Sequence, residues 1–154
     1  SDCKKIHPKL KLLIAGDGIE KENLQKLTMS LGIKKHVAFL GDIPNENIGE
    51  IFSRCFASIS ASKSEAFGIV NIESLREGTP IICTNTEGSQ DILFNGQNGY
   101  NVDLLHKNDL SKKISKILEN WNYFSQNALR TFEEKYSERN ISHHYKVYTN
   151  ELNK

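Results

Sequence analysis

Two glutamates, Glu65 and Glu73, flank a glycine that stands where a loop gives way to a helix. Gly68 follows Phe67 directly, and the residues after it are typical of the first turns of a helix. The first N–H groups of a helix have no partner inside the helix, so they attract anions. A carboxylate can accept hydrogen bonds from sugar hydroxyls. The arrangement therefore suits a sugar donor that carries phosphate.

The spacing of the two glutamates is weak evidence by itself. Among the 13 Glu of this chain, a pair with seven residues between its members is expected about once by chance. Two solvated carboxylates, one on a loop and one on a helix, are the alternative interpretation. Gly68 favours the functional interpretation, because glycine lets the backbone approach a ligand closely. Ile69 and Val70 would then offer N–H donors beside it.

Short apolar runs alternate with segments of helical periodicity along the chain. The apolar runs predict strands at residues 10–15, 36–40, 56–61 and 79–84, and a short edge strand at 99–102. The helical periodicity predicts helices at residues 20–31, 44–52, 68–77, 89–94, 104–118, 121–134 and 137–152. In the first of these helices, Leu24, Leu27 and Leu31 recur at helical spacing and form its apolar face.

This alternation predicts an α/β fold, a Rossmann-like parallel sheet with helices on both faces. Ligands of such sheets bind beyond the carboxyl ends of the strands. We expect the loops at that edge to form one crevice; they cover residues 16–18, 41–43, 60–67 and 85–89. The chain has no Pro/Gly-rich linker, so residues 1–154 are expected to form a single domain.

The composition argues against several functions. A net charge of +1 gives no basic face for nucleic acid. No apolar run approaches the roughly 20 residues that span a bilayer. Cys3, Cys55 and Cys83 have no CxxC spacing, and we interpret Cys55 and Cys83 as buried thiols. The pair His143-His144 has no ligands at metal spacing and no Asp-x-Asp occurs, so neither a metal nor another cofactor is expected.

Residues 60–80 resemble the donor-binding segment of the group 1 (family four) retaining glycosyltransferases, which have the two-domain GT-B fold. The resemblance rests on residues that stand at the family's motif positions: Ser62, Glu65, Phe67, Gly68, Glu73, Gly78 and Pro80. Residues 12–18, 37–41 and 91–102 also resemble family segments, so that the resemblance covers about residues 7–118. The Gly16-Asp17-Gly18 turn could instead begin a dinucleotide fingerprint, but no third glycine follows at the required spacing.

The resemblance implies a role for each matching residue. Glu65 would be catalytic and face the donor sugar, and Glu73 would bind the nucleotide ribose. The other implied donor-binding residues hold the sugar and diphosphate (Phe67, Gly68, Ile69, Val70), lie near the base (Ile43) or line the pocket (Gly16, Gly18).

Some family features are replaced or absent. Residues 87–91 read Glu-Gly-Ser-Gln-Asp where the family often has Gly-Gly before Pro-Glu, and Ala66 follows the first glutamate. A first strand with a following Arg and Lys, and the whole N-terminal acceptor domain, have no counterpart in the sequence. We therefore expect the C-terminal half of a GT-B enzyme that is inactive alone.

The expected function is transfer of a hexose from a nucleotide-diphosphate sugar to a glycan or lipid-linked acceptor. The resemblance suggests bacterial lipopolysaccharide or capsule biosynthesis by a cytoplasmic enzyme, peripheral at the inner face of the cell membrane. Nucleic acid is not an expected partner. The alternative is a non-catalytic nucleotide- or partner-binding module on the same Rossmann-like sheet, since fold alone does not decide function.

Overall fold

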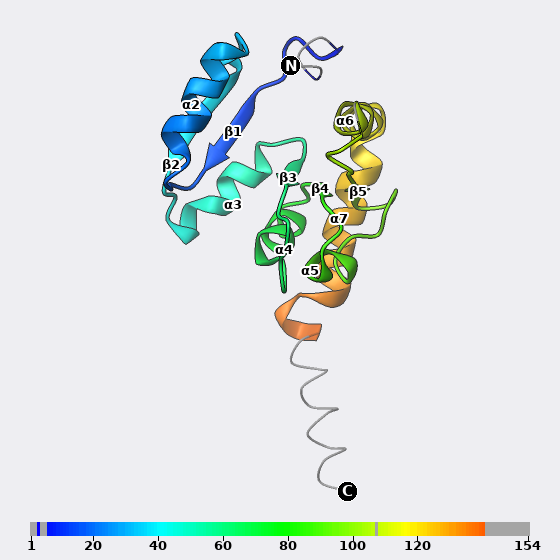
Figure 1. The fold of residues 1–154 in the computed structure, drawn as a ribbon. Coiled ribbons are helices and arrows are strands. Elements are labelled where there is room, and N and C mark those ends of the chain that lie inside the picture. The colour runs from blue at the N-terminus through cyan, green and yellow to red at the C-terminus, as the bar shows by residue number, and fades with distance from the viewer. Residues whose placement is uncertain (1–2, 4–5, 107, 141–154) are drawn as a thin grey trace, which may run out of the picture. The chain divides into compact units, whose positions relative to one another are not determined.

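A computed structural model describes Cys3, residues 6–106 and residues 108–140. The chain forms two compact units, Ser1–Ile48 and Gly49–Lys154 (Figure 1). Within the described ranges, no helix combines the length and apolarity needed to cross a membrane. All but the first four residues of the helix expected at 137–152 lie outside the described residues.

Unit 1 (residues 1–48) contains a two-stranded parallel sheet at the positions that the sequence predicts. Strand β1 (Leu12–Ala15) pairs with strand β2 (Val37–Gly41). Helix α2 (Lys21–Ser30) and the short 3-10 helix η1 (Lys34–His36) connect the two strands, and helix α3 (Asn45–Ser53) begins at the end of the unit. A parallel pair needs such a crossover connection, so the pattern of unit 1 is that of a βαβ unit.

The helix expected at residues 20–31 is present as α2, and its leucines at helical spacing are exposed. Leu24, Leu27 and Leu31 are 39%, 51% and 45% exposed, and Thr28 is the buried residue of this helix. The physical reason lies in the size of unit 1. Two strands and one long helix supply no second layer inside the unit that could cover this face.

Unit 2 (residues 49–154) holds a three-stranded parallel sheet in the order β3-β4-β5. Its elements follow in chain order: β3 (Ser58–Ser60), α4 (Ile69–Arg76), β4 (Ile81–Cys83), α5 (Glu87–Gln90), β5 (Gly99–Asn101), α6 (Asp109–Glu119) and α7 (Trp121–Lys135). All strands predicted from the sequence are present, two of them in unit 1 and three in unit 2. The organisation as a single domain stays a prediction.

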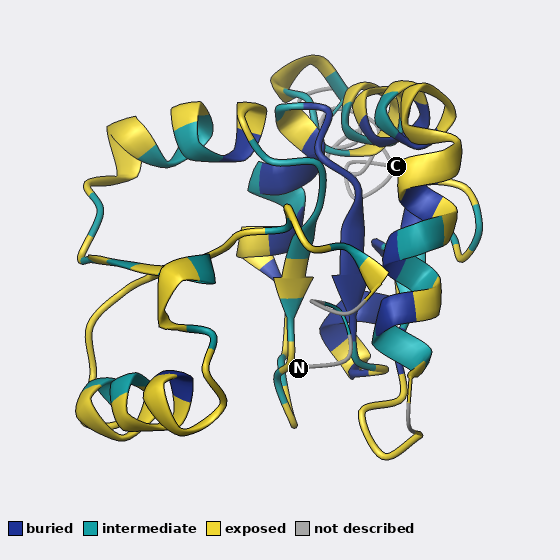
Figure 2. Cartoon of the chain, turned by 90° about the horizontal axis from the view of Figure 1, so that it is seen from above, coloured by how far each residue is buried: buried dark blue, intermediate teal, exposed yellow. Residues whose placement is uncertain are grey.

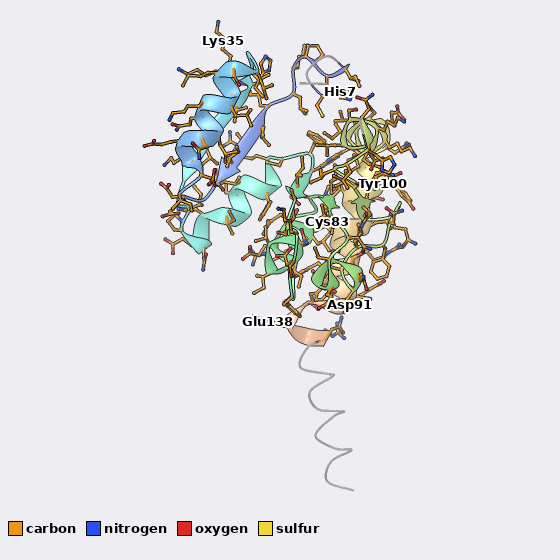
Figure 3. The ribbon with its side chains drawn as sticks, in the orientation of Figure 1. His7, Lys35, Cys83, Asp91, Tyr100 and Glu138 are labelled. Carbon is orange, nitrogen blue, oxygen red and sulfur yellow. The ribbon has the colours of Figure 1, made fainter. Side chains whose placement is uncertain are left out.

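The core of unit 2 surrounds its central strand. Every residue of β4 is buried, and the side chains of Ile81 and Cys83 lie in one cluster with Leu75, Ile92 and Ala128. Helix α7 packs against α4 (Figure 1), and Figure 2 shows the buried residues gathered on the strands and helices of this unit. Cys83 is buried as expected (Figure 3), whereas Cys55 is only half-buried, which corrects that part of the prediction.

Asn98 ties the segment before β5 to helix α7. Its side chain is fully buried, and its Oδ1 accepts the N–H of Phe94 at 2.9 Å. Its Nδ2 donates to the carbonyl of Ile92 at 2.9 Å and to Thr131 Oγ1 at 3.3 Å. Because each partner is itself polar and enclosed by the fold, Asn98 satisfies groups that would otherwise destabilise the unit.

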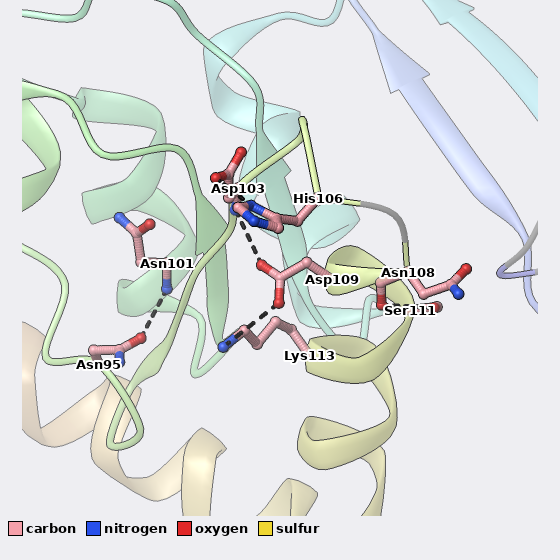
Figure 4. A network of polar contacts seen from close by, with 8 residues as sticks. All are labelled: Asn95, Asn101, Asp103, His106, Asn108, Asp109, Ser111 and Lys113. Atoms are coloured by element: carbon pink, nitrogen blue, oxygen red, sulfur yellow. Dashed lines mark hydrogen bonds and ion pairs between the residues drawn. The ribbon is translucent and has the colours of Figure 1, made fainter.

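Replacing Asn98→Ala should lower the free energy of unfolding by about 2–4 kcal/mol, because it leaves buried polar groups without partners. The change is measured as a lower midpoint of urea denaturation. Asn95→Ala is the matched control, since Asn95 Oδ1 accepts the N–H of Asn101 at an exposed position (Figure 4). Equal losses for the two variants would contradict this account of Asn98.

Candidate functional site

The loop between β3 and α4 ends in a helix start that is open. Gly68 is the N-cap of α4 at a φ of 74°, a left-handed conformation that favours glycine. The N–H groups of Asn71 and Ile72 bond to the Gly68 carbonyl, at 2.9 and 3.3 Å. In the described part of the chain, the N–H groups of Ile69 and Val70 have no acceptor. This helix start can therefore receive an anionic oxygen.

The surface around this helix start is apolar as well as open. The side chains of Phe67, Ile69 and Val70 are 62%, 60% and 52% exposed, whereas Gly68 itself is buried. The predicted donor-binding residues of unit 2 thus lie next to one another at one helix end. Their role in binding stays a prediction.

Glu65 is held at both its side chain and its backbone. The hydroxyl of Ser60 donates to Glu65 Oε2 at 3.4 Å, and Ser60 Oγ also lies 3.3 Å from Ser62 Oγ. The Glu65 carbonyl accepts the N–H of Gly88 at 2.8 Å. The half-buried carboxylate is consequently oriented by the end of β3 rather than left to move freely in solvent.

Glu73 lies inside α4 and is half-buried. It stands four residues after Ile69, so the two share one face of the helix. Among the residues that the structure describes, none bonds to its carboxylate, and its oxygens are available to accept hydrogen bonds. Both predicted carboxylates therefore belong to unit 2, one before and one within the same helix.

A close backbone contact fixes the loop of residues 65–68, which we call the glutamate loop. A Cβ on Gly88 would lie 2.6 Å from the Phe67 nitrogen and 2.9 Å from the Ala66 carbonyl carbon. These distances are too short for any side chain, so only glycine lets the start of α5 reach the glutamate loop. The sequence analysis noted Gly88 only as part of a departure from the family motif, and the structure gives the residue a role in positioning this loop.

Hydroxyl side chains hold the neighbouring segments in place. The Thr84 hydroxyl donates to the Ser62 carbonyl at 2.5 Å, and the Thr84 N–H donates to the Ser60 carbonyl at 3.1 Å. Ser89 Oγ accepts the N–H of Thr86 at 2.9 Å. Sequence reasoning missed these positioning residues. The available signal was the presence of hydroxyl residues directly at the ends of two adjacent predicted strands.

Cys83 lies at the end of β4, opposite Ser60 in the sheet register. Burial is the main cause that raises the pKa of its thiol; the Ser89 hydroxyl lowers the pKa and the Glu65 carboxylate raises it, and together the three bring it to about 11. The thiol therefore stays neutral near pH 7 and is no nucleophile. The influence of Glu65 indicates that its carboxylate lies close to this strand end.

The remaining predicted site residues belong to unit 1. Gly16 follows β1 at a φ of 104°, and its N–H donates to the carbonyl of Gly41 at 2.7 Å. The Gly18 N–H donates to Asp17 Oδ1 at 2.9 Å, and hydrogen bonds from Lys21 and Gly18 lower the Asp17 pKa. Ile43 is half-buried in the loop after β2. The structure brings Gly16 and Gly18 together in one turn, and their place in a pocket with Glu65 stays a prediction.

The loop after β5 is closed by its own side chains (Figure 4). Asp103 accepts the N–H of Leu105 at 2.8 Å and lies 2.6 Å from His106 Nδ1, and these bonds lower the Asp103 pKa. Asp109 Oδ2 accepts the N–H of Asp103 at 3.0 Å. The helix expected at 104–118 therefore begins only at Asp109, since the preceding residues form this polar turn.

Comparison with known proteins identifies the family. The model of the family "Glycosyl transferases group 1" matches residues 1–138. The chain belongs to this family. It is 30% identical over 135 residues to an uncharacterized glycosyltransferase, MJ1607, of Methanocaldococcus jannaschii, covering 86% of this chain and 35% of the relative. It is 32% identical over 124 residues to the lipopolysaccharide core biosynthesis glycosyltransferase LpsE of Rhizobium meliloti, covering 80% and 34%.

Solved structures share the fold. The pneumococcal O-GlcNAc transferase GtfA, in complex with UDP and GlcNAc, matches with a TM-score of 0.81 at 21% identity, over 99% of this chain and 32% of GtfA. Anabaena HepE, in complex with UDP, matches with a TM-score of 0.78 at 20% identity, over 96% and 43%. These matches confirm the predicted α/β fold of GT-B glycosyltransferases. The group 1 chain spans about a third of the length of the curated relatives it matches.

Replacing Gly88→Ala should displace the glutamate loop, because the added methyl group collides with the backbone of Phe67. We expect a loss of about 1–3 kcal/mol in the free energy of unfolding and shifted backbone amide resonances at residues 65–70. Gly49→Ala is the control, since its Cβ meets only flexible side-chain ends of Arg76 and Glu77. Unchanged resonances in Gly88→Ala would show that the contact does not fix the loop.

The Cys83 thiol should make stability fall with pH in the alkaline range. Its pKa in the folded state, about 11, exceeds the value of 9.0 for a free thiol. Its stabilising contribution is therefore complete below pH 9 and is lost as the pH rises from 9 to 11, by up to about 3 kcal/mol. In urea denaturation at several pH values, Cys83→Ala should show a smaller decline over this range. Parallel declines would contradict the raised pKa.

Proposed function

We propose that this chain is the donor-binding part of a family four retaining glycosyltransferase that uses a nucleotide-diphosphate sugar. The observation that carries the proposal is the open start of α4, where the N–H groups of Ile69 and Val70 are unbonded among the described residues, at the end of the loop that carries Glu65. A diphosphate needs hydrogen-bond donors, and a sugar needs acceptors for its hydroxyls. The structures of GtfA with UDP and GlcNAc and of HepE with UDP support a ligand of this class.

In the proposed reaction, the bond between the anomeric carbon and the diphosphate oxygen breaks, and the electron pair stays on that oxygen. The N–H groups at the start of α4 stabilise the charge that develops there. The acceptor hydroxyl attacks the anomeric carbon from the face that the diphosphate leaves and passes its proton to an oxygen of the departing diphosphate. Glu65 orients the sugar hydroxyls and stabilises positive charge near the ring, without forming a covalent intermediate.

The remaining predicted residues complete the proposed donor site. Glu73, whose carboxylate bonds to none of the described residues, accepts hydrogen bonds from the ribose hydroxyls. Phe67 and Gly68 hold the sugar and diphosphate together with the helix start. In unit 1, Ile43 lies near the base, and Gly16 and Gly18 line the pocket.

The acceptor and the setting are proposed for the whole protein. Because the chain spans about a third of its curated relatives, we assign acceptor binding to the rest of such a protein and expect no hexose transfer by this part alone. The lipopolysaccharide role in the name of LpsE supports a glycan or lipid-linked acceptor in cell-envelope synthesis. Such an acceptor favours a cytoplasmic enzyme, peripheral at the inner face of the membrane.

A second function is favoured by one observation. The exposed side chains of Phe67, Ile69 and Val70 would also suit a non-catalytic module that binds a protein partner. Calorimetry with nucleoside diphosphates separates the two functions, since only the donor site requires nucleotide binding.

Replacing Glu65→Ala in the full-length enzyme should lower turnover of the nucleotide sugar by about 10²–10⁴-fold, because the sugar loses an oriented acceptor. Circular dichroism and thermal unfolding should show that the variant stays folded. Glu77→Ala is the control, since Glu77 forms an exposed ion pair with Arg76 at 2.9 Å and turnover should change less than about twofold. Near-normal turnover of Glu65→Ala would remove Glu65 from the site.

A further inference from the structure

Asn71 carries a buried donor that no neighbour uses. The residue is 1% exposed, and its side-chain Nδ2 is buried without a hydrogen-bond partner among the described residues. Asn71 is the third residue of α4, and its backbone N–H already bonds to the Gly68 carbonyl at 2.9 Å. An unpartnered amide inside a protein is costly, and in a native structure it calls for a specific reason.

The free amide lies at the start of the helix. The position that a Cβ on Gly68 would take is 3.2 Å from Asn71 Nδ2, 3.3 Å from the Gly88 carbonyl oxygen and 3.1 Å from Ile92 Cδ1. The side chain of Asn71 is therefore directed back toward the N-cap, where the N–H groups of Ile69 and Val70 are also unbonded. Only a glycine, without a side chain, separates the amide from that helix end.

We propose that Asn71 is a further ligand-binding residue, whose amide donates to a phosphate oxygen of a ligand bound at the start of α4. This inference rests on the proposed function. Gly68 lies next to the Asn71 amide, so its backbone must move for the ligand to reach that amide. Glycine allows such a movement because no side chain restricts its backbone. Bound ligand then gives the amide the acceptor that the ligand-free protein lacks.

A purely structural role explains the residue less well. Asn is a poor helix former, and leucine, which has the same number of side-chain non-hydrogen atoms, would bury an apolar group at this position without an unmet donor. Ser74 shows the contrast on the same helix, because its fully buried hydroxyl donates to the Thr79 carbonyl at 2.9 Å. The polar side chain of Ser74 is satisfied inside the fold, whereas that of Asn71 is not.

The test compares Asn71→Leu with Ser74→Ala in the full-length protein, by calorimetric titration with UDP, ADP, GDP and uridine and by thermal unfolding. For the diphosphate that the wild type binds, Asn71→Leu should raise the Kd about tenfold, with an equal or higher melting temperature. Ser74→Ala should lower the melting temperature and leave the Kd unchanged within about twofold. Binding of uridine, which has no phosphate, should be the same in Asn71→Leu and the wild type.

Every other result contradicts the role of Asn71 or the proposed function. An unchanged diphosphate Kd in Asn71→Leu overturns the role of Asn71 and leaves the proposed function standing. If Asn71→Leu weakens the binding of diphosphate and of uridine equally, the role of Asn71 is also overturned. A general disturbance of the fold would weaken the binding of both ligands in this way. A wild type that binds none of the diphosphates overturns the proposed function and this inference together. Should Asn71→Leu fail to fold, Asn71→Ala replaces it under the same criteria.

Discussion

The approach of Gly88 to the backbone of Phe67 is the constraint on which the site depends. It brings the start of α5 against the glutamate loop and lets the Gly88 N–H bond to the Glu65 carbonyl at 2.8 Å. A loop anchored through its backbone keeps its side chains free. The start of α4 and the carboxylate oxygen of Glu65 that Ser60 does not bond are consequently available to a ligand.

Some polar groups around the glutamate loop form hydrogen bonds within the protein, and others are left without a partner. The hydroxyl of Thr84 bonds to the backbone of Ser62, and the hydroxyl of Ser89 accepts a backbone N–H within its own segment. These bonds satisfy groups that would otherwise compete for the ligand or for solvent. Among the described residues, the N–H groups of Ile69 and Val70, the amide of Asn71 and the carboxylate of Glu73 are unbonded on helix α4. A preorganised binding site requires both: supporting groups whose hydrogen bonds are made within the protein, and binding groups that are left unbonded for the ligand.

Sequence patterns were sufficient for the elements and insufficient for the contacts between them. The short apolar runs located every strand, and the residues around Gly68 located α4, because these signals are local. The exposure of the α2 leucines could not be read from their spacing, since burial depends on a further layer that unit 1 does not contain. The pairing of Ser60 with Thr84 and of Glu65 with Gly88 joins residues more than 20 positions apart, which no spacing rule encodes. The sequence does not predict a role for Asn71, because a donor without a hydrogen-bond partner can be recognised only when the positions of its neighbours are known.

The choice of residue at the N-cap of α4 links stability to the proposed function. Ser, Thr, Asp or Asn at this position would stabilise the helix by about 1 kcal/mol, by accepting the N–H of the second or third helical residue. Gly68 provides no side-chain cap, and the N–H of Val70, the second residue, remains unbonded in the described structure. A capping side chain would occupy the same N–H that a phosphate oxygen needs. An uncapped start to α4 is therefore what anion binding demands, and the helix instead draws its stability from Leu75 in the core and from its packing against α7.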